Sequence, residues 1–220
     1  MHSFAIQSTL TMSEKDYLKD ISEIKNMMNK SSQFISLSGL SGVLAGIYAL
    51  IGAFFAHTIL NNHGSTDYIM QSDAYEPETS AVTSLSIIAV VIILLSVATG
   101  LIFSNIKAKK QGESLWNSVA KRLLINFMIP LFAGGTFTLI LLRDEYFGLI
   151  APVMLIFYGM ACLNASKNTL RDVRYLGITM IIIGLTAAVF PRYGLYFWAL
   201  GFGICHIFYG TVMHMKYDRK

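Results

Sequence analysis

Six long apolar stretches, separated by short polar connections, dominate the pattern of this chain. A helix needs roughly 20 apolar residues to cross the hydrocarbon core of a bilayer, and the six stretches are close to that length. The predicted spans cover residues 34–60, 82–106, 123–142, 147–164, 175–190 and 193–213. Pro191 and Gly194 predict a tight turn between the fifth span and the sixth.

The overall composition supports lipid as the solvent of this chain. Of its 220 residues, 54% are hydrophobic and only 14% are charged, whereas soluble domains carry about 25% charged residues. We therefore expect an all-α membrane protein, a six-transmembrane-helix bundle with an N-terminal amphipathic helix. Its predicted parts are a cytoplasmic segment (1–33), the transmembrane domain (34–213) and a cytoplasmic tail (214–220).

The lysines and arginines alternate between connections in a way that predicts orientation. Fifteen of the 17 lie before the first span or after the second, fourth and sixth, and the other two are Arg143 and Arg192. Basic residues favour the cytoplasmic side, so we expect an inner-membrane protein with both termini cytoplasmic. The net charge of +4 does not indicate a nucleic-acid partner, because the basic residues lie in short connections where they set the orientation in the membrane.

The longest connection on the opposite side, residues 61–81, is acidic. It has four carboxylates and His63 but no EF-hand spacing, which predicts a solvated loop, with a divalent-cation site as the alternative. Cys162 and Cys205 both lie inside spans, so they are predicted to be packing residues and not members of a disulfide framework.

Small residues recur at intervals of four in several spans. Such spacing allows helix backbones to approach closely, which drives association in lipid. Two interpretations stay open, packing within the bundle and a homo-oligomer interface, because a GxxxG pair serves both. The residues are Ser38, Gly42 and Gly46, then Ser96, Gly100 and Ser104, and Ala199 with Gly203. Pro130, Gly134–Gly135 and Pro152 are predicted to bend the third and fourth spans.

Two amphipathic stretches flank the spans. In residues 13–32, Tyr17, Ile21, Ile24 and Met28 recur at helical spacing. This predicts a helix on the cytoplasmic face, against headgroups or the bundle, with docking of a cytoplasmic protein as the alternative. Met12 is an alternative start. In residues 113–124, Trp116 suits the headgroup level, and Lys121 with Arg122 suits anionic lipid.

Charged side chains are scarce inside the spans, which narrows the chemistry. No Asp, Glu, Lys or Arg falls clearly within a span, and the chain has no HExxH motif. These features argue against transport coupled to a buried carboxylate and against intramembrane proteolysis by an aspartyl pair. We predict no catalytic residue, no metal site and no cofactor.

Two histidines and two asparagines are the polar residues to weigh inside the spans. His57 lies near an outer end and His206 deeper in the sixth span, so they do not share the depth that a bis-histidine haem requires. His206 either lines a ligand or solute pathway with Tyr209, Phe202 and Cys205, or forms a hydrogen bond within the bundle. Asn126 is a further pathway candidate, and both Asn126 and Asn164 are predicted to form hydrogen bonds, either between helices or at the membrane interface.

The run YLKDISEIKNMMNKSSQFISLSGLSGVLAGIYALIGAFFA, residues 17–56, resembles the N-terminal part of a group of bacterial six-span inner-membrane proteins. The resemblance implies an inner-membrane bundle with a cytoplasmic amphipathic head. Some members of that group are described as β-carotene cleavage oxygenases. Such an enzyme needs several histidines around iron, whereas His2, His63 and His214 lie outside the spans or at their ends. This sequence therefore does not support that chemistry.

Three functional hypotheses follow. The first is a non-enzymatic scaffold, sensor or regulatory subunit with the N-terminal head as its output surface. The second is a small-solute transporter or channel, and the third is a membrane enzyme acting on a lipid or an isoprenoid.

Overall fold

The computed structural model describes residues 21, 38–62, 79–112 and 116–218, which form helices and no strand. Six helical segments of this part are long and apolar enough to cross a membrane. The prediction of an all-α, six-helix, multi-pass membrane protein is confirmed. The first five are α2 (Gly39–Asn62), α4 (Thr79–Lys110), α5 (Ser118–Arg143), α6 (Phe147–Ala165) and α7 (Asp172–Val189).

The sixth segment, Pro191–Asp218, is built from several helical pieces. They are η2 (Pro191–Tyr193), α8 (Gly194–Trp198), the π-helical η3 (Ala199–Cys205), α9 (His206–Met213) and the π-helical η4 (His214–Asp218). Helical structure therefore continues past Met213, where the sequence suggested that a tail begins. The short η1 (Ser166–Asn168) lies between α6 and α7.

Several helices are longer than the hydrophobic pattern indicated. α4 continues beyond the expected end at Ile106 to Lys110, and α5 begins at Ser118, five residues before the expected start. The side chain of Asn117 caps α5 by accepting a hydrogen bond from the backbone N–H of Ala120. These extra turns carry polar side chains, so hydropathy alone places the boundary at the edge of the lipid-facing part.

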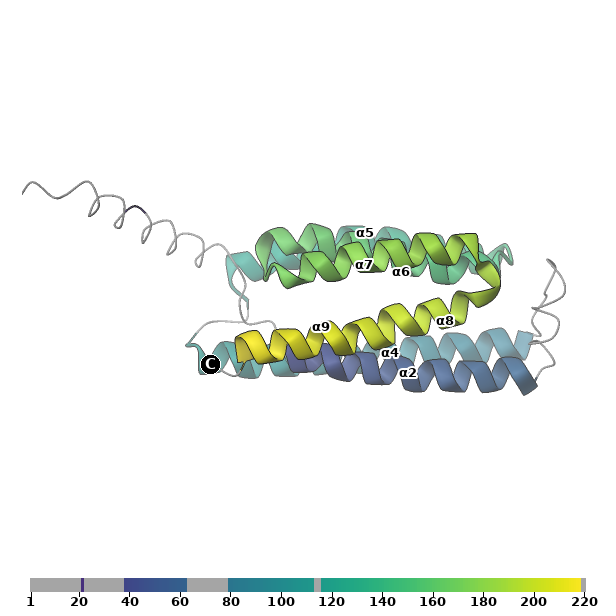
Figure 1. Cartoon of the computed structure of the whole chain (residues 1–220), viewed down its shortest axis with the longest axis horizontal. Helices are drawn as coiled ribbons and strands as arrows, with labels where there is room; N and C mark the ends of the chain where they lie inside the picture. The colour runs from purple at the N-terminus through teal and green to yellow at the C-terminus, as the bar shows by residue number, and fades with distance from the viewer. Residues whose placement is uncertain (1–20, 22–37, 63–78, 113–115, 219–220) are drawn as a thin grey trace, which may run out of the picture.

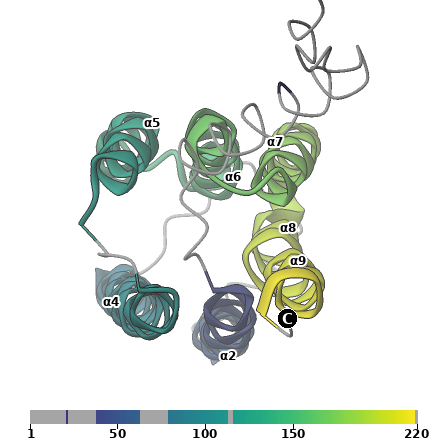
Figure 2. The same ribbon diagram turned by 90° about the vertical axis from the view of Figure 1, so that its left-hand side faces the viewer.

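The helices are arranged in two layers (Figure 1). One layer contains α5, α6 and α7, and the other contains α2 and α4, as the end-on view shows (Figure 2). α6 packs extensively against both α5 and α7, whereas α4 packs on α2. The buried core cluster includes Leu155, Met180 and Met213, so it lies between α6, α7 and the sixth span.

The sixth span passes from one layer to the other (Figure 1). Its first part, α8, packs against α6 and α7, while η3 and α9 pack against α2. Among the described residues, the two layers are therefore joined chiefly through this span.

Glycines allow α2 and the sixth span to approach each other closely. A Cβ atom on Gly46 would lie 2.6 Å from the backbone oxygen of Gly203, and one on Gly42 would lie 3.4 Å from the Cα of Gly210. This small-residue surface of α2 is thus occupied inside the chain, as the internal-packing interpretation expects. Ser38 and Ser41 at the start of α2 are buried as well.

A second glycine contact, which the sequence did not single out, joins α6 and α7. A Cβ atom on Gly159 would lie 2.7 Å from the oxygen of Gly177, and one on Gly177 would lie 2.7 Å from the oxygen of Gly159. The two backbones meet directly, which allows α6 and α7 to pack extensively against each other.

The small residues of α4 behave differently from those of α2. Ser104 is buried, Ser96 is half-buried, and no described atom lies within 4 Å of a Cβ built on Gly100. Gly100 therefore makes no close helix contact within the described part of the chain, where the main contacts of α4 are with α2.

Some sequence predictions concern residues outside the described ranges. The amphipathic head at 13–32 is one of them, apart from Ile21, which is helical and exposed. Most of the acidic connection at 61–81, with His63, is another.

The described basic side chains are distributed unequally between the two ends of the bundle. The "basic end" is the end where α4 and α6 finish and α5 and α7 begin, and the last described residues lie there (Figure 1). It carries Lys107, Lys109, Lys110, Lys121, Arg122, Lys167, Arg171, Arg174 and Lys216. The opposite end carries Arg143 and Arg192.

Candidate functional site

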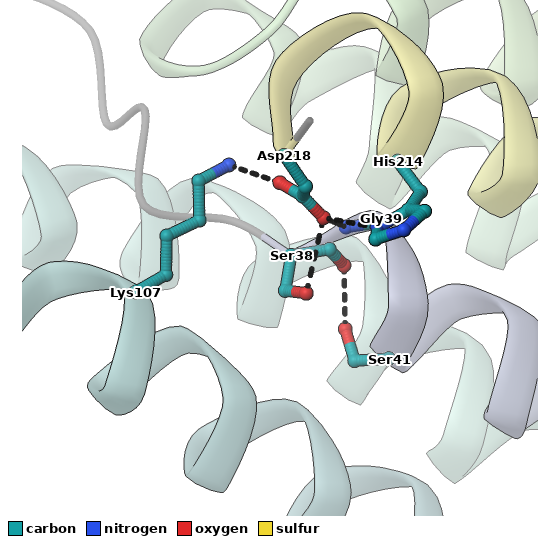
Figure 3. A network of polar contacts seen from close by, with 6 residues as sticks. All are labelled: Ser38, Gly39, Ser41, Lys107, His214 and Asp218. Carbon is teal, nitrogen blue, oxygen red and sulfur yellow. Dashed lines mark hydrogen bonds and ion pairs between the residues drawn. The ribbon is translucent and has the colours of Figure 1, made fainter. Parts of the chain in front are cut away.

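A polar network at the basic end centres on the carboxylate of Asp218 (Figure 3). Lys107 Nζ lies 2.6 Å from one carboxylate oxygen of Asp218. The other oxygen accepts the backbone N–H of Gly39 at 3.0 Å and lies 3.1 Å from His214 Nδ1. Ser38 Oγ also reaches this oxygen at 3.4 Å. One carboxylate thus joins α2, α4 and the sixth span.

Local structure explains why Asp218 reaches these partners. The extra turn of α4 carries Lys107 to the level of the start of α2, and η4 places Asp218 one turn beyond His214. The N–H groups of a first helical turn lack partners within the helix, and a negative charge there is favoured by the helix dipole. Asp218 satisfies the Gly39 amide from a position 179 residues away in sequence.

The central ion pair of this network is largely shielded from solvent. The side chains of Lys107 and Asp218 are 12% and 11% exposed, whereas that of His214 is 38% exposed. A shielded charge pair is costly to break on one side only, because the remaining charge has no partner. The Asp218 network therefore holds the first, second and sixth spans in one arrangement.

A second ion pair ties the same turn to α7. Lys216 Nζ lies 3.0 Å from a carboxylate oxygen of Asp172, the first residue of α7. Lys216 also lies over the ring of Tyr217 at 4.9 Å from its centroid. Together, Lys216 and Asp218 connect η4 to both layers of the bundle.

A second candidate site lies in the middle of the sixth span around His206, which is 8% exposed. Its Nε2 lies 2.8 Å from the hydroxyl of Tyr158 on α6, and its Nδ1 lies 3.0 Å from the backbone oxygen of Gly201. Its ring also stacks on Phe202 at 5.9 Å. The hydrogen bond within the bundle that the sequence suggested for His206 is present.

The Gly201 contact lies at the end of the π-helical segment. The backbone N–H of His206 donates to the Gly203 carbonyl, and the Gly201 carbonyl accepts a ring N–H from His206. If Nδ1 carries the proton of a neutral ring, Nε2 accepts a hydrogen bond from the Tyr158 hydroxyl. π-Helical turns are uncommon and frequently coincide with functional positions.

The other pathway candidates make separate contacts. Asn126 donates from its side chain to Asn168 at 2.9 Å, and its backbone oxygen accepts the Asn164 amide at 2.8 Å. The Tyr209 hydroxyl lies 3.1 Å from Thr179 Oγ1, and Cys205 is a half-buried free thiol. The structure thus divides His206, Tyr209 and Asn126 among three hydrogen-bonded contacts.

Among the described residues, the His, Cys, Asp and Glu side chains are candidates for metal ligands. No three His, Cys, Asp or Glu side chains gather there as ligands. His57 contacts Asn61 and the ring of Tyr196, which precedes His206 by ten residues in the sixth span.

Two side chains of these candidate sites are not indicated by the sequence pattern. Tyr158 lies in an apolar span, where a tyrosine looks like a packing residue. Asp218 falls in the predicted tail, although its spacing of four from His214 is a helical pair signal. Lys107 and Gly39 gave no sequence signal for this site.

Comparisons with protein families, curated proteins and solved structures give no match to this chain. The resemblance carried by residues 17–56 therefore stays a prediction.

Proposed function

We propose that the protein is an integral inner-membrane protein that acts by interaction, as a scaffold, sensor or regulatory subunit, with both termini in the cytoplasm. The single observation that carries this proposal is the Asp218 network. It lies at the basic end, the end that faces the cytoplasm in this proposal.

The location of the network links the N-terminal segment to the bundle. Ser38 and Gly39 are the residues through which that segment enters α2, and both contact Asp218. A displacement of the segment acts first on these two residues. The contacts of Asp218 then transmit this displacement to α4 through Lys107 and to the sixth span through η4, which contains Asp218. A partner held by the N-terminal segment thereby acts on three spans at once.

The experiment compares three chains for a bound protein partner. The full chain, a chain lacking residues 1–32 and Asp218→Asn are isolated from native membranes after mild crosslinking, and bound proteins are quantified by mass spectrometry. We expect one partner at a fixed ratio on the full chain, none on the truncated chain, and a reduced ratio on Asp218→Asn. Asp144→Asn, at the opposite end, is the matched control and keeps the full ratio.

Two results contradict the proposal. One is retention of the same partner by the truncated chain, and the other is the absence of any partner at a fixed ratio on the full chain. Thermal unfolding of the truncated chain in detergent checks that the bundle itself is intact.

The alternative is a small-solute transporter or channel, and the Tyr158–His206 pair favours it. Transporter sites are commonly formed where a membrane helix departs from regular α-helical geometry, and His206 follows such a segment. This alternative expects solute flux in proteoliposomes that is lost with His206→Ala and kept with His57→Ala. Absence of flux across a broad solute panel contradicts it.

A further inference from the structure

We propose that an anionic diacyl phospholipid binds between α4 and α5 at the basic end, with its headgroup on Lys109, Lys110, Lys121 and Arg122. This inference is independent of the proposed function. It rests on three observations about the described residues: how α4 and α5 pack, how the charges are paired, and where Trp116 lies.

The first observation is that α4 and α5 are consecutive but do not pack against each other as neighbouring spans do. They lie on the same side of the bundle in opposite layers (Figure 2), and α4 makes its main contacts with α2 and α5 with α6. Apolar side chains on both stay exposed near the basic end. Ile102 and Ile106 of α4 are 56% and 46% exposed, and Ile125 and Ile129 of α5 are 59% and 62% exposed.

These exposed side chains lie at depths that the acyl chains of a lipid reach. Ile102 precedes Lys110, and Ile129 follows Lys121, by about 12 Å along each helix. That distance is within one leaflet of a hydrocarbon core about 30 Å thick. A lipid whose headgroup contacts these lysines therefore brings its chains alongside the exposed isoleucines.

The second observation is the pairing of charges at the basic end. Its described carboxylates, Asp172 and Asp218, are already paired with Lys216 and Lys107. Among the described residues, no carboxylate pairs with Lys109, Lys110, Lys121 or Arg122, and all four are exposed. A group of basic residues that no described carboxylate neutralises, next to the ends of two spans, attracts anionic headgroups.

The third observation is Trp116, which lies in the connection between α4 and α5 and is 59% exposed. Tryptophan favours the headgroup level, where its ring contacts apolar chains and its N–H meets water. The Trp116 ring thus reports on a lipid held at this connection.

The experiment measures quenching of Trp116 by lipids brominated on their acyl chains. The chain has two tryptophans, so Trp198→Phe leaves Trp116 as the single tryptophan, which is excited selectively over tyrosine. The protein is reconstituted into phosphatidylcholine vesicles with brominated phosphatidylglycerol or brominated phosphatidylcholine at equal mole fractions. We expect phosphatidylglycerol to bind at least about fivefold more strongly than phosphatidylcholine. This lower bound is the contribution of one basic residue near the surface, about 1 kcal/mol.

A matched pair of triple variants locates the site. Lys110→Gln with Lys121→Gln and Arg122→Gln removes three charges at the α4–α5 connection. Lys167→Gln with Arg171→Gln and Arg174→Gln removes three charges at the α6–α7 connection of the same end. We expect the first set to lose the phosphatidylglycerol preference and the second set to keep it, with both sets as thermally stable as the parent.

Four outcomes overturn the proposal. Equal quenching by the two lipids shows that there is no headgroup preference. An equal loss of the phosphatidylglycerol preference in both triple variants shows that the preference comes from general surface charge. Loss of the phosphatidylglycerol quenching on addition of soluble glycerol phosphate shows that the site binds a water-soluble anion. Finally, phosphatidylglycerol quenching that appears only after deletion of residues 1–32 identifies the N-terminal segment as the occupant.

Discussion

The side-chain amide of Asn164 donates a hydrogen bond to the backbone carbonyl of Asn126, at 2.8 Å. That carbonyl lies four residues before Pro130, which is inside α5 and has no N–H to offer it. α6 thus supplies the hydrogen bond that the proline removes from α5. In lipid this matters, because no water is present to satisfy a free carbonyl.

We expect Asn164→Leu to destabilise the bundle by about 1 kcal/mol, since it leaves the Asn126 carbonyl without a donor. In a Pro130→Ala background the helix regains its own N–H donor, so the same substitution is expected to cost less. Reversible unfolding by SDS in mixed micelles measures the four corners of this cycle. Equal costs in the two backgrounds contradict the compensation.

The contact between Gly46 and Gly203 leads to a second prediction. A Cβ atom on Gly46 meets backbone atoms of Gly203 and Ile207 at 2.6 and 2.9 Å. We therefore expect Gly46→Ala to push α2 away from α9 and to cost about 1–3 kcal/mol, as overpacking does. Gly100→Ala is the control, because its Cβ has open space. Thermal unfolding in detergent compares the two, and equal midpoints contradict the prediction.

The Asp218 network leads to a third prediction. Asp218→Asn removes the carboxylate that lies 2.6 Å from the shielded Lys107 Nζ, so we expect a loss of about 3 kcal/mol in unfolding free energy. Adding Lys107→Met removes the shielded positive charge as well and is expected to restore part of the loss. If the double variant is as unstable as Asp218→Asn alone, the loss does not come from the charge of Lys107.

The control for this prediction is the exposed ion pair of Arg143 and Asp144 at the opposite end, in which Arg143 Nε lies 2.7 Å from Asp144 Oδ1. The hydrogen bond from Arg143 lowers the pKa of the Asp144 carboxyl, so this group is ionised at neutral pH. Asp144→Asn therefore removes a charge as Asp218→Asn does. Because the pair is exposed, we expect a much smaller loss of stability than for Asp218→Asn.

The proposed orientation gives a fourth prediction. In a chain with Cys162→Ala and Cys205→Ala, single cysteines replace Arg192 or Lys167, which lie at opposite ends of the bundle. A membrane-impermeant maleimide is expected to label Arg192→Cys in intact cells and Lys167→Cys only after permeabilisation. The reverse pattern contradicts the orientation.

The spans could be predicted from the sequence because lipid exposure imposes a long, uninterrupted apolar pattern. Hydrogen bonds of Asn126 and Asn164 could be expected as well, since an amide in lipid requires a partner, but the sequence did not pair the two residues with each other. That the acceptor is a carbonyl freed by Pro130 was not expected, because sequence does not show which helices are neighbours.

The site depends on features that hydropathy does not encode. The extra turns that carry Lys107 and Asp218 are polar, so the apolar pattern ends before them. Tyr158 has an apolar ring and a single hydroxyl, and only the packing of α6 against the sixth span shows that this hydroxyl meets His206. The crossing of the sixth span between layers has no counterpart in the sequence pattern.

That crossing has a consequence for biogenesis. During synthesis α2 can associate with α4, and α5 with α6 and α7, as soon as each group has entered the membrane, because their contacts lie within the group. The two groups acquire their main contacts only when α8, η3 and α9 are inserted. A ribosome stalled before the sixth span would therefore leave two preassembled halves side by side in the bilayer, unsealed and accessible to membrane chaperones and proteases.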